Sequence, residues 1–132
     1  MECKLKHLEL CQNVVTRMAG NSFFLKGWAV TITSAIFAIS SVEKIGHGIF
    51  IVIIPILIFW FLDSYYLRQE RLYRKLYDAV RVKKEEEIDF SLNASVFNSD
   101  VQSLIRIMFS VSILPFYSSL LLVEMILSRF LQ

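Results

Sequence analysis

The chain has 132 residues, of which 55% are hydrophobic, and its mean hydropathy is +0.54. A soluble domain of this length buries about two thirds of its surface, so this composition would leave many apolar side chains facing water. That excludes an ordinary soluble domain and favours a single membrane domain over residues 1–132. The formal net charge is only +2, but the charges are distributed unevenly along the chain.

The first 21 residues are mixed in polarity and are predicted to form an amphipathic helix, which either runs on into the first apolar segment or bends at residues 20–22. Apolar side chains recur at intervals of 3, 3, 4 and 3 residues, the spacing of one helix face, at Leu5, Leu8, Cys11, Val15 and Met18. The segment lacks the continuous apolar stretch of a cleavable signal peptide. Its two cysteines are eight residues apart, which is about 12 Å along a helix and too far for a disulfide bridge.

Three apolar segments are predicted to cross the membrane, at about residues 23–41, 48–67 and 104–127. Each is close to the roughly 20 residues that a helix needs to cross the hydrocarbon. The second is expected to continue as a long cytoplasmic helix, so residues 1–21 and 68–100 form the predicted cytoplasmic helical region. The predicted fold class is therefore an all-α membrane protein with three transmembrane helices, an amphipathic N-terminal helix and a long cytoplasmic extension of the second span.

The basic residues predict the orientation of these spans. Twelve of the 14 Lys and Arg residues lie before the first span, after the second, or at the start of the third. Only Lys44 and Arg129 lie on the other side. Because cytoplasmic loops carry an excess of Lys and Arg, the N-terminus is predicted to be cytoplasmic and the C-terminus periplasmic in a bacterial inner membrane.

Three ionisable residues are expected at one depth near the cytoplasmic face. Counted from the centre of the short turn between the first two spans, Lys26 lies 18 residues before it and Asp63 lies 19 residues after it. Arg106 is a few residues into the third predicted helix. A charge at this depth is costly unless it is paired or reaches the headgroups. The three are therefore interpreted as an interhelical charge cluster, as independent interface residues, or as a gating element.

Small side chains form a stripe along the first span, at intervals of 4, 3, 4 and 3 residues. The stripe consists of Gly27, Thr31, Ser34, Ala38 and Ser41. Such a face lets helices approach closely and hydrogen-bond, and it also suits the lining of a narrow aqueous path in an oligomer. Both helix packing and pore lining remain open at this point.

Two prolines fall in the middle of predicted spans. Pro55 lies in the second and Pro115 in the third. Proline removes a backbone hydrogen bond from a helix interior, so each position permits a kink.

The basic helix after the second span combines cationic and aromatic side chains. Tyr73 and Tyr77 lie about 15 and 21 Å beyond Asp63 at helical rise, which is past the interfacial belt where tyrosines are common. Rings beside guanidinium groups can stack nucleobases and hold phosphates, although they can also pack on a neighbouring helix, and the cations can contact anionic lipids. The candidate ligand-binding residues are Arg68, Arg71, Tyr73, Arg74, Tyr77 and Arg81.

The sequence carries no recognisable catalytic motif. It contains no Gly-rich phosphate loop and no metalloprotease or nucleophile-elbow pattern. The two histidines, His7 and His47, are predicted to lie on opposite sides of the membrane. An enzyme is therefore not expected, and neither a metal nor a cofactor is predicted.

Three stretches resemble one family of small bacterial membrane proteins. They are RMAGNSFFLKGWAVT (17–31), FWFLDSYYLRQERLYRKLYDAV (59–80) and FYSSLLLV (116–123), which together cover about a third of the chain. The run LDxYYLRQERLYRxLYD is the most distinctive of them. The family is that of the membrane effectors of the Hailong anti-phage defence system, which are paired with a nucleotidyltransferase-like enzyme.

The resemblance implies a homo-oligomeric, channel-like effector in the lipid bilayer. A nucleotide or short single-stranded DNA oligomer made by the partner enzyme would hold it closed, and loss of that ligand during infection would let it depolarise the membrane.

Two other classes of protein fit the same residues. One is a membrane-anchored adaptor or assembly protein that docks a soluble partner through its basic cytoplasmic helix, and the other is a small toxin or holin-like protein that needs no ligand.

Overall fold

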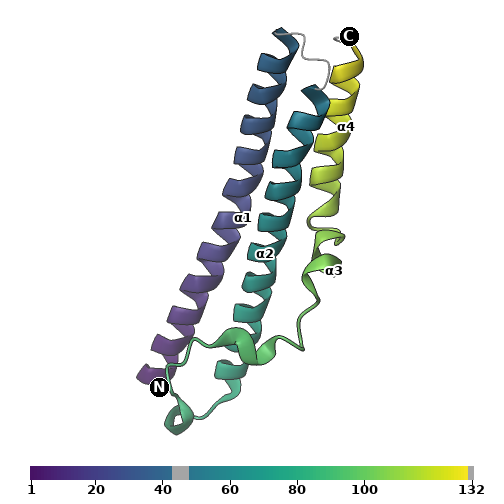
Figure 1. Ribbon diagram of the computed structural model, residues 1–132. Helices are drawn as coiled ribbons and strands as arrows, with labels where there is room; N and C mark the ends of the chain where they lie inside the picture. Colours follow the sequence, from purple (N-terminus) through teal and green to yellow (C-terminus); the bar gives the residue numbers. More distant parts are fainter. Residues whose placement is uncertain (43–47, 131–132) are drawn as a thin grey trace.

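The computed structural model describes the backbone of residues 1–42 and 48–130 and the side chains of residues 1–40 and 51–130. Over these residues the chain is helical and contains no strand. In chain order the elements are α1 (Glu2–Val42), α2 (Gly48–Val82), the 3₁₀ helices η1 (Glu85–Glu87) and η2 (Ala94–Phe97), α3 (Leu104–Met108) and α4 (Leu114–Phe130). Helices α1 and α2 lie antiparallel and side by side, and α4 lies beside α2 (Figure 1). The all-helical prediction is confirmed.

Helices α1 and α2 are each long and apolar enough to cross a membrane, over Glu2–Ser40 and Ile51–Val82. Large apolar side chains face outward around them, including Phe23, Phe24 and Trp28, which are 58–75% exposed in the single chain. Contiguous exposed apolar surface of this kind is unusual for a soluble monomer and is ordinary where lipid covers it.

The N-terminal segment continues directly into the first long apolar stretch, because α1 runs through both without a break for 41 residues. Gly20 does not interrupt α1, and a side chain added there would meet no atom within 4 Å. Of the apolar face predicted for residues 1–21, Cys11 and Val15 are buried, whereas Leu5 is 60% exposed.

The third predicted span, 104–127, is not one continuous helix. A break at residues 109–113 separates the five-residue α3 from α4, which has 17 residues and spans about 25 Å at helical rise. Pro115 explains where α4 starts, because its ring nitrogen carries no hydrogen to donate to the preceding turn and proline is tolerated in a first helical turn. Pro115 therefore lies at the start of α4 rather than in the middle of a continuous span. In contrast, α2 continues through Pro55.

Two buried apolar clusters hold the helices together. The span core lies between the apolar parts of the helices and consists of Ala29, Val52, Ile56, Ile107, Ile113 and Tyr117. The arm core lies under the basic arm of α2 (residues 68–82) and consists of Cys11, Leu72, Leu76, Val80 and Ala94. The basic arm is thus not a free rod, because it packs on the first half of α1 and on the chain that returns from it.

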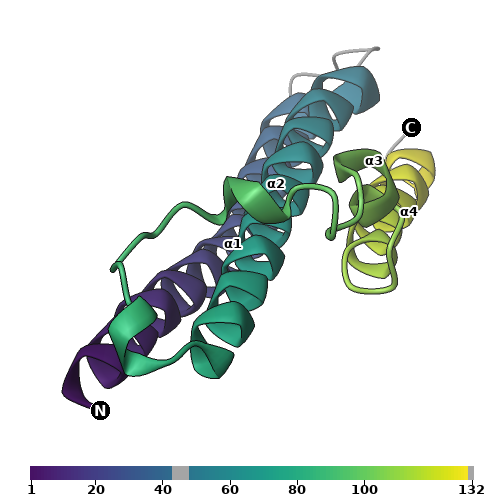
Figure 2. The same cartoon turned by 90° about the horizontal axis from the view of Figure 1, so that it is seen from below.

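The return segment, residues 83–103, doubles back from the end of α2 and crosses the basic arm (Figures 1 and 2). At its start, Glu85 accepts hydrogen bonds from the backbone amides of Cys3 (2.8 Å) and Lys4 (3.3 Å). The Met1 amino group, 2.7 Å from the carboxylate, and these two amides hold the pKa of Glu85 below its usual value. Glu85 therefore caps the beginning of α1 and ties it to the end of α2.

Candidate functional site

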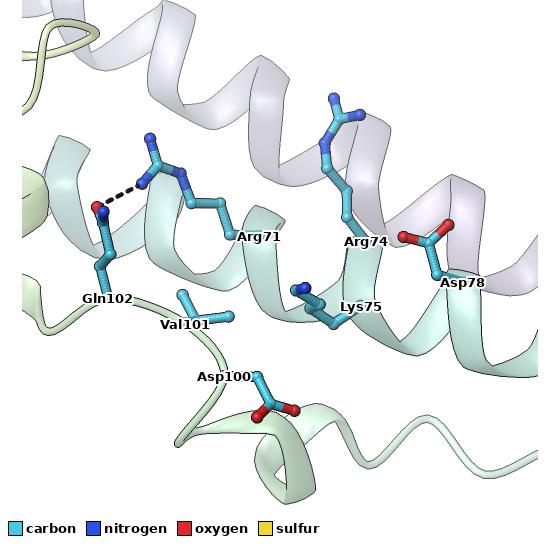
Figure 3. A pocket seen from close by; sticks show the side chains of 7 residues that line it. All are labelled: Arg71, Arg74, Lys75, Asp78, Asp100, Val101 and Gln102. Carbon is cyan, nitrogen blue, oxygen red and sulfur yellow. Dashed lines mark hydrogen bonds between the residues drawn. The ribbon is translucent and has the colours of Figure 1, made fainter.

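A groove of about 290 Å³ opens where the return segment crosses the basic arm (Figure 3). We call it the basic groove, and its lining residues are Arg71, Arg74, Lys75, Asp78, Asp100, Val101 and Gln102. The first four follow a helical spacing on one side of α2, and the last three come from the return segment. The groove therefore exists only because two segments that are distant in sequence meet.

Two cations give the basic groove its anion-binding potential. Arg71 donates one hydrogen bond to the side-chain oxygen of Gln102 (3.1 Å), which leaves its other guanidinium hydrogens available. Lys75 lies one turn beyond Arg71 on α2 and lines the same groove (Figure 3). Among the residues that the structure describes, neither Arg71 nor Lys75 forms an ion pair with a carboxylate. Both charges can therefore serve an external anion.

The other cation of the groove, Arg74, is neutralised from within its own helix. Its guanidinium pairs with Glu70 one turn earlier, at 2.7 and 2.8 Å, and in Figure 3 it extends away from Asp100. This is the i,i+4 pair expected on a solvated helix, and it limits what Arg74 can give to a ligand.

Arg68 has a structural task that the sequence did not indicate. Its guanidinium donates to the carbonyl of Gln102 (3.2 Å) and to the side-chain and backbone oxygens of Asn98 (3.3 and 3.4 Å). It thus fastens the return segment to the basic arm. Arg68 and Tyr73 also line a second, more polar groove of about 380 Å³ on the side of residues 92–98.

The six predicted ligand-binding residues are consequently divided by the structure. Only Arg71 and Arg74 line the basic groove, and Arg68 and Tyr73 line the second. Tyr77 packs on the arm core with Tyr73, and Arg81 is exposed near the end of α2, outside both grooves.

Five lining residues of the basic groove were not among the predicted ligand-binding residues: Lys75, Asp78, Asp100, Val101 and Gln102. Lys75 was recognisable, because it lies four residues after Arg71 on the same helix face. Nothing in the sequence pattern indicated Asp100, Val101 and Gln102, which belong to the return segment.

A second polar site joins the helices above the basic arm. Asp63 is fully buried in α2 and pairs with Lys26 of α1 at 2.5 Å. Its carboxylate also accepts hydrogen bonds from the hydroxyls of Ser22 and of Tyr117, the latter at 3.1 Å. The predicted pairing of Lys26 with Asp63 is present, but Arg106 is exposed on α3 and does not join them. The break that precedes α4 places Tyr117, rather than Arg106, against the carboxylate.

The small-residue stripe faces outward. Gly27, Thr31, Ser34 and Ala38 are all exposed, and a side chain added at Gly27 would meet no atom within 4 Å. The Ser41 side chain lies outside the described residues. The other side of α1 makes the internal contacts, through residues such as Ala29 and Thr33. The stripe therefore does not pack within the single chain.

The fold and the two sites define an all-helical protein with two helices of membrane-spanning length and a basic groove beside them. Within the described part of the chain, no group of three or more His, Cys, Asp or Glu residues could hold a metal ion. Comparison with protein-family models, with curated proteins and with solved structures found no match to this chain.

Proposed function

We propose that this protein is an oligomeric ion channel or pore of the bacterial inner membrane, whose conductance is controlled by a nucleotide or short single-stranded DNA oligomer bound on the cytoplasmic side. The observation that carries the proposal is the continuity of α2, which runs from the apolar span into the wall of the basic groove. An anion bound in the groove therefore acts directly on a helix that crosses the membrane.

The proposal includes three crossings, with α4 as the third. The beginning of α1 and the end of α4 lie at opposite ends of the bundle, as an odd number of crossings requires (Figure 1). Several apolar side chains of α4 are exposed, including Leu122 (59%) and Met125 (58%), and these would face lipid or another copy. With the N-terminus cytoplasmic, the basic groove faces the cytoplasm.

The chemistry of the basic groove suits a phosphate better than a carboxylate or an apolar ligand. Arg71 offers a planar donor fork and Lys75 a point charge one turn away, a combination that recurs at phosphate sites. The volume is at the lower end of small-molecule pockets, so one groove would hold about one nucleotide unit. In a longer ligand, neighbouring units would extend toward Tyr73 in the second groove, where an aromatic ring can stack a base.

The ion pair between Lys26 and Asp63 stands where α2 leaves the span core for the basic arm. Ser22, Lys26 and Tyr117 hold Asp63 from α1 and α4, so a shift of α2 must disturb all three contacts together. A junction of this kind has few alternative arrangements, which favours discrete states over gradual bending. In this mechanism the ligand shifts the equilibrium between those states by binding one of them more tightly.

Conduction requires several copies, because three helices cannot enclose a water-filled path. The exposed stripe on α1 supplies a face where another helix can approach closely or where water can pass. In this proposal, the pore or the contact between copies lies along Gly27, Thr31, Ser34 and Ala38.

Ion flux through the purified protein in liposomes tests the proposal. We expect flux that falls when a short DNA oligomer is added on the side of the basic groove and that is unchanged when it is added on the other side. No flux from folded, oligomeric protein under either condition would contradict the channel and favour the membrane-anchored adaptor. Flux that the oligomer does not change would indicate a pore that this ligand does not control, as expected of the toxin-like class.

Two glycine variants test whether the stripe mediates contact between copies rather than folding of the single chain. Gly27→Leu should reduce flux and the oligomeric fraction, because it places a bulky side chain on the stripe. Gly20→Leu is the matched control, since that position is equally open in the single chain and lies outside the stripe. An equal effect of both variants would contradict the role of the stripe.

The two native cysteines test the orientation without any substitution. Cys3 is exposed, whereas Cys11 is fully buried in the arm core, and burial raises the pKa of its thiol and so suppresses the reactive thiolate. We expect a membrane-impermeant maleimide to label Cys3 in inside-out vesicles but not in intact cells whose outer membrane has been permeabilised. Cys11 should react only after denaturation, and Cys3→Ser should abolish labelling of the folded protein. Labelling from the periplasmic side would reverse the orientation.

A further inference from the structure

Helix α4 buries two side chains completely against the rest of the bundle, and both are polar: Tyr117 and Glu124. Tyr117 is satisfied, because its hydroxyl contacts the carbonyl of Phe59 (3.2 Å) and the carboxylate of Asp63 (3.1 Å). Glu124 differs. It is 3% exposed, and its Oε2 atom has no hydrogen-bond partner among the described residues. The mechanism proposed above gives this carboxyl group no task.

No cation among the described residues is placed to balance a negative charge on Glu124. Glu124 is seven residues, or about two turns and 10 Å, beyond Tyr117 on α4. On the facing helix α1, the nearest cation in sequence is Lys26, which is engaged by Asp63. Arg129, the basic residue of α4 itself, is exposed near the end of the helix. None of the described residues forms an ion pair with Glu124. An isolated carboxylate in such surroundings is strongly disfavoured, so the neutral acid is the stable form.

The hydrogen bond of the Thr33 hydroxyl suits a protonated carboxyl group better than a carboxylate. The carboxyl lies within hydrogen-bonding reach of the Thr33 hydroxyl on α1. A hydroxyl has a single hydrogen, and Thr33 directs it to the backbone carbonyl of Ala29 at 2.7 Å. Thr33 can therefore offer Glu124 only a lone pair. A hydrogen bond between the two side chains forms only if Glu124 is the donor.

We propose that Glu124 is a proton-binding site in the interior of the helix bundle, with the Thr33 hydroxyl as acceptor for the bound proton. The ligand of this site is H⁺, and the site is distinct from the basic groove and from the ion pair of Asp63. Among the described residues, the two buried carboxyl groups thus differ in their surroundings: Asp63 forms an ion pair with Lys26, whereas Glu124 has no such partner and holds a proton. The assignment does not depend on whether the protein conducts ions.

A hydrophobic carbodiimide tests the assignment directly. The acid adds its O–H across a C=N bond of the reagent, and transfer of the acyl group to nitrogen then gives a stable N-acylurea. The protein gains the mass of one whole reagent molecule, and no oxidant or leaving group is involved. We expect dicyclohexylcarbodiimide to modify Glu124 in the folded protein at neutral pH, where an exposed carboxyl has lost its proton. Asp63 should remain unmodified, and peptide mass spectrometry distinguishes the two positions.

A water-soluble carbodiimide and one isosteric variant complete the test. The water-soluble reagent should modify exposed carboxyl groups such as Glu86 and spare Glu124. Glu124→Gln should abolish the hydrophobic labelling and leave the melting temperature of the detergent-solubilised protein unchanged, because the amide keeps the shape and neutrality of the acid. Folded protein that is not labelled at Glu124, or that is labelled there by the water-soluble reagent, would overturn the assignment. A large fall in the melting temperature of Glu124→Gln, of the size expected when a buried ion pair is broken, would also overturn it. If Glu124 is labelled but the purified protein shows no ion flux, the channel proposal is refuted and the assignment of the proton site still holds.

Discussion

Replacing Asp63 with Ala is expected to be the most destabilising single substitution in this chain. Asp63 is fully buried and is the common acceptor for Lys26, Ser22 and Tyr117, which come from α1 and α4. Its removal leaves Lys26, a quarter exposed, without its counter-charge at a helix interface. Breaking a buried pair by removing one partner costs about 3–5 kcal/mol. The free energy of unfolding, measured by denaturant titration in detergent micelles, should fall by about that amount.

The double variant Asp63→Ala with Lys26→Met decides whether the pair itself is responsible. Removing both charges avoids a buried, uncompensated cation, so the double variant should recover most of the lost stability. Asp78→Ala serves as a control, since this carboxylate is exposed on the basic arm and should change stability little. Equal destabilisation in the single and double variants would show that the stability comes from the other contacts of Asp63 rather than from Lys26.

Reversing two charges in the basic groove, Arg71→Glu with Lys75→Glu, is expected to abolish binding of a short single-stranded DNA oligomer. These are the two groove cations that have no carboxylate partner among the described residues, so their charges are the most available to a phosphate. A hydrogen bond to a charged group contributes about 1.5–3 kcal/mol, so losing two of them lowers affinity at least about 100-fold. Fluorescence anisotropy of a labelled oligomer at fixed ionic strength measures the change. Binding to the unaltered protein should weaken steeply with added salt.

The control for net charge is the pair Arg81→Glu with Lys84→Glu. It changes the total charge by the same amount in the same part of the chain, but both residues are exposed outside the groove. We expect it to retain most of the affinity. If the two double variants lose affinity equally, binding depends on the general charge of this region, and the groove is not the site. If only the control pair loses affinity, the ligand binds at the end of the basic arm.

Several features follow from local sequence alone, because they depend on periodicity and composition. The apolar runs, the short turn between them and the unbroken stretch after residue 59 specify two long antiparallel helices. Counting along such helices from a shared turn places residues at known depths, which is why the pairing of Lys26 with Asp63 was predictable. The same counting failed for Arg106, because it assumed a continuous third helix where the structure has a break.

Helix α1 and the stripe show a second limit of sequence reasoning. A stripe of small residues indicates that a helix face suits close contact, but not which partner it meets. The internal contacts of α1 use the neighbouring face instead, because Ala29 and Thr33 lie against the span core and leave Gly27 and Thr31 outward. For the same reason, tyrosines on the basic arm could be assigned to packing or to a ligand only after their neighbours were known. Tyr73 and Tyr77 pack on the arm core.

The sequence by itself therefore determined the helical class, the two long apolar helices and the charged pair between them, because each depends on residues at fixed intervals along one chain. The tertiary structure alone decided the basic groove, the clamp made by Arg68 and the burial of Glu124 against Thr33. Each of these needs a contact between segments whose relative placement comes from packing and from the path of an irregular return segment. Helical periodicity carries no information about that path, so the chemistry of the sites became visible only in the folded chain.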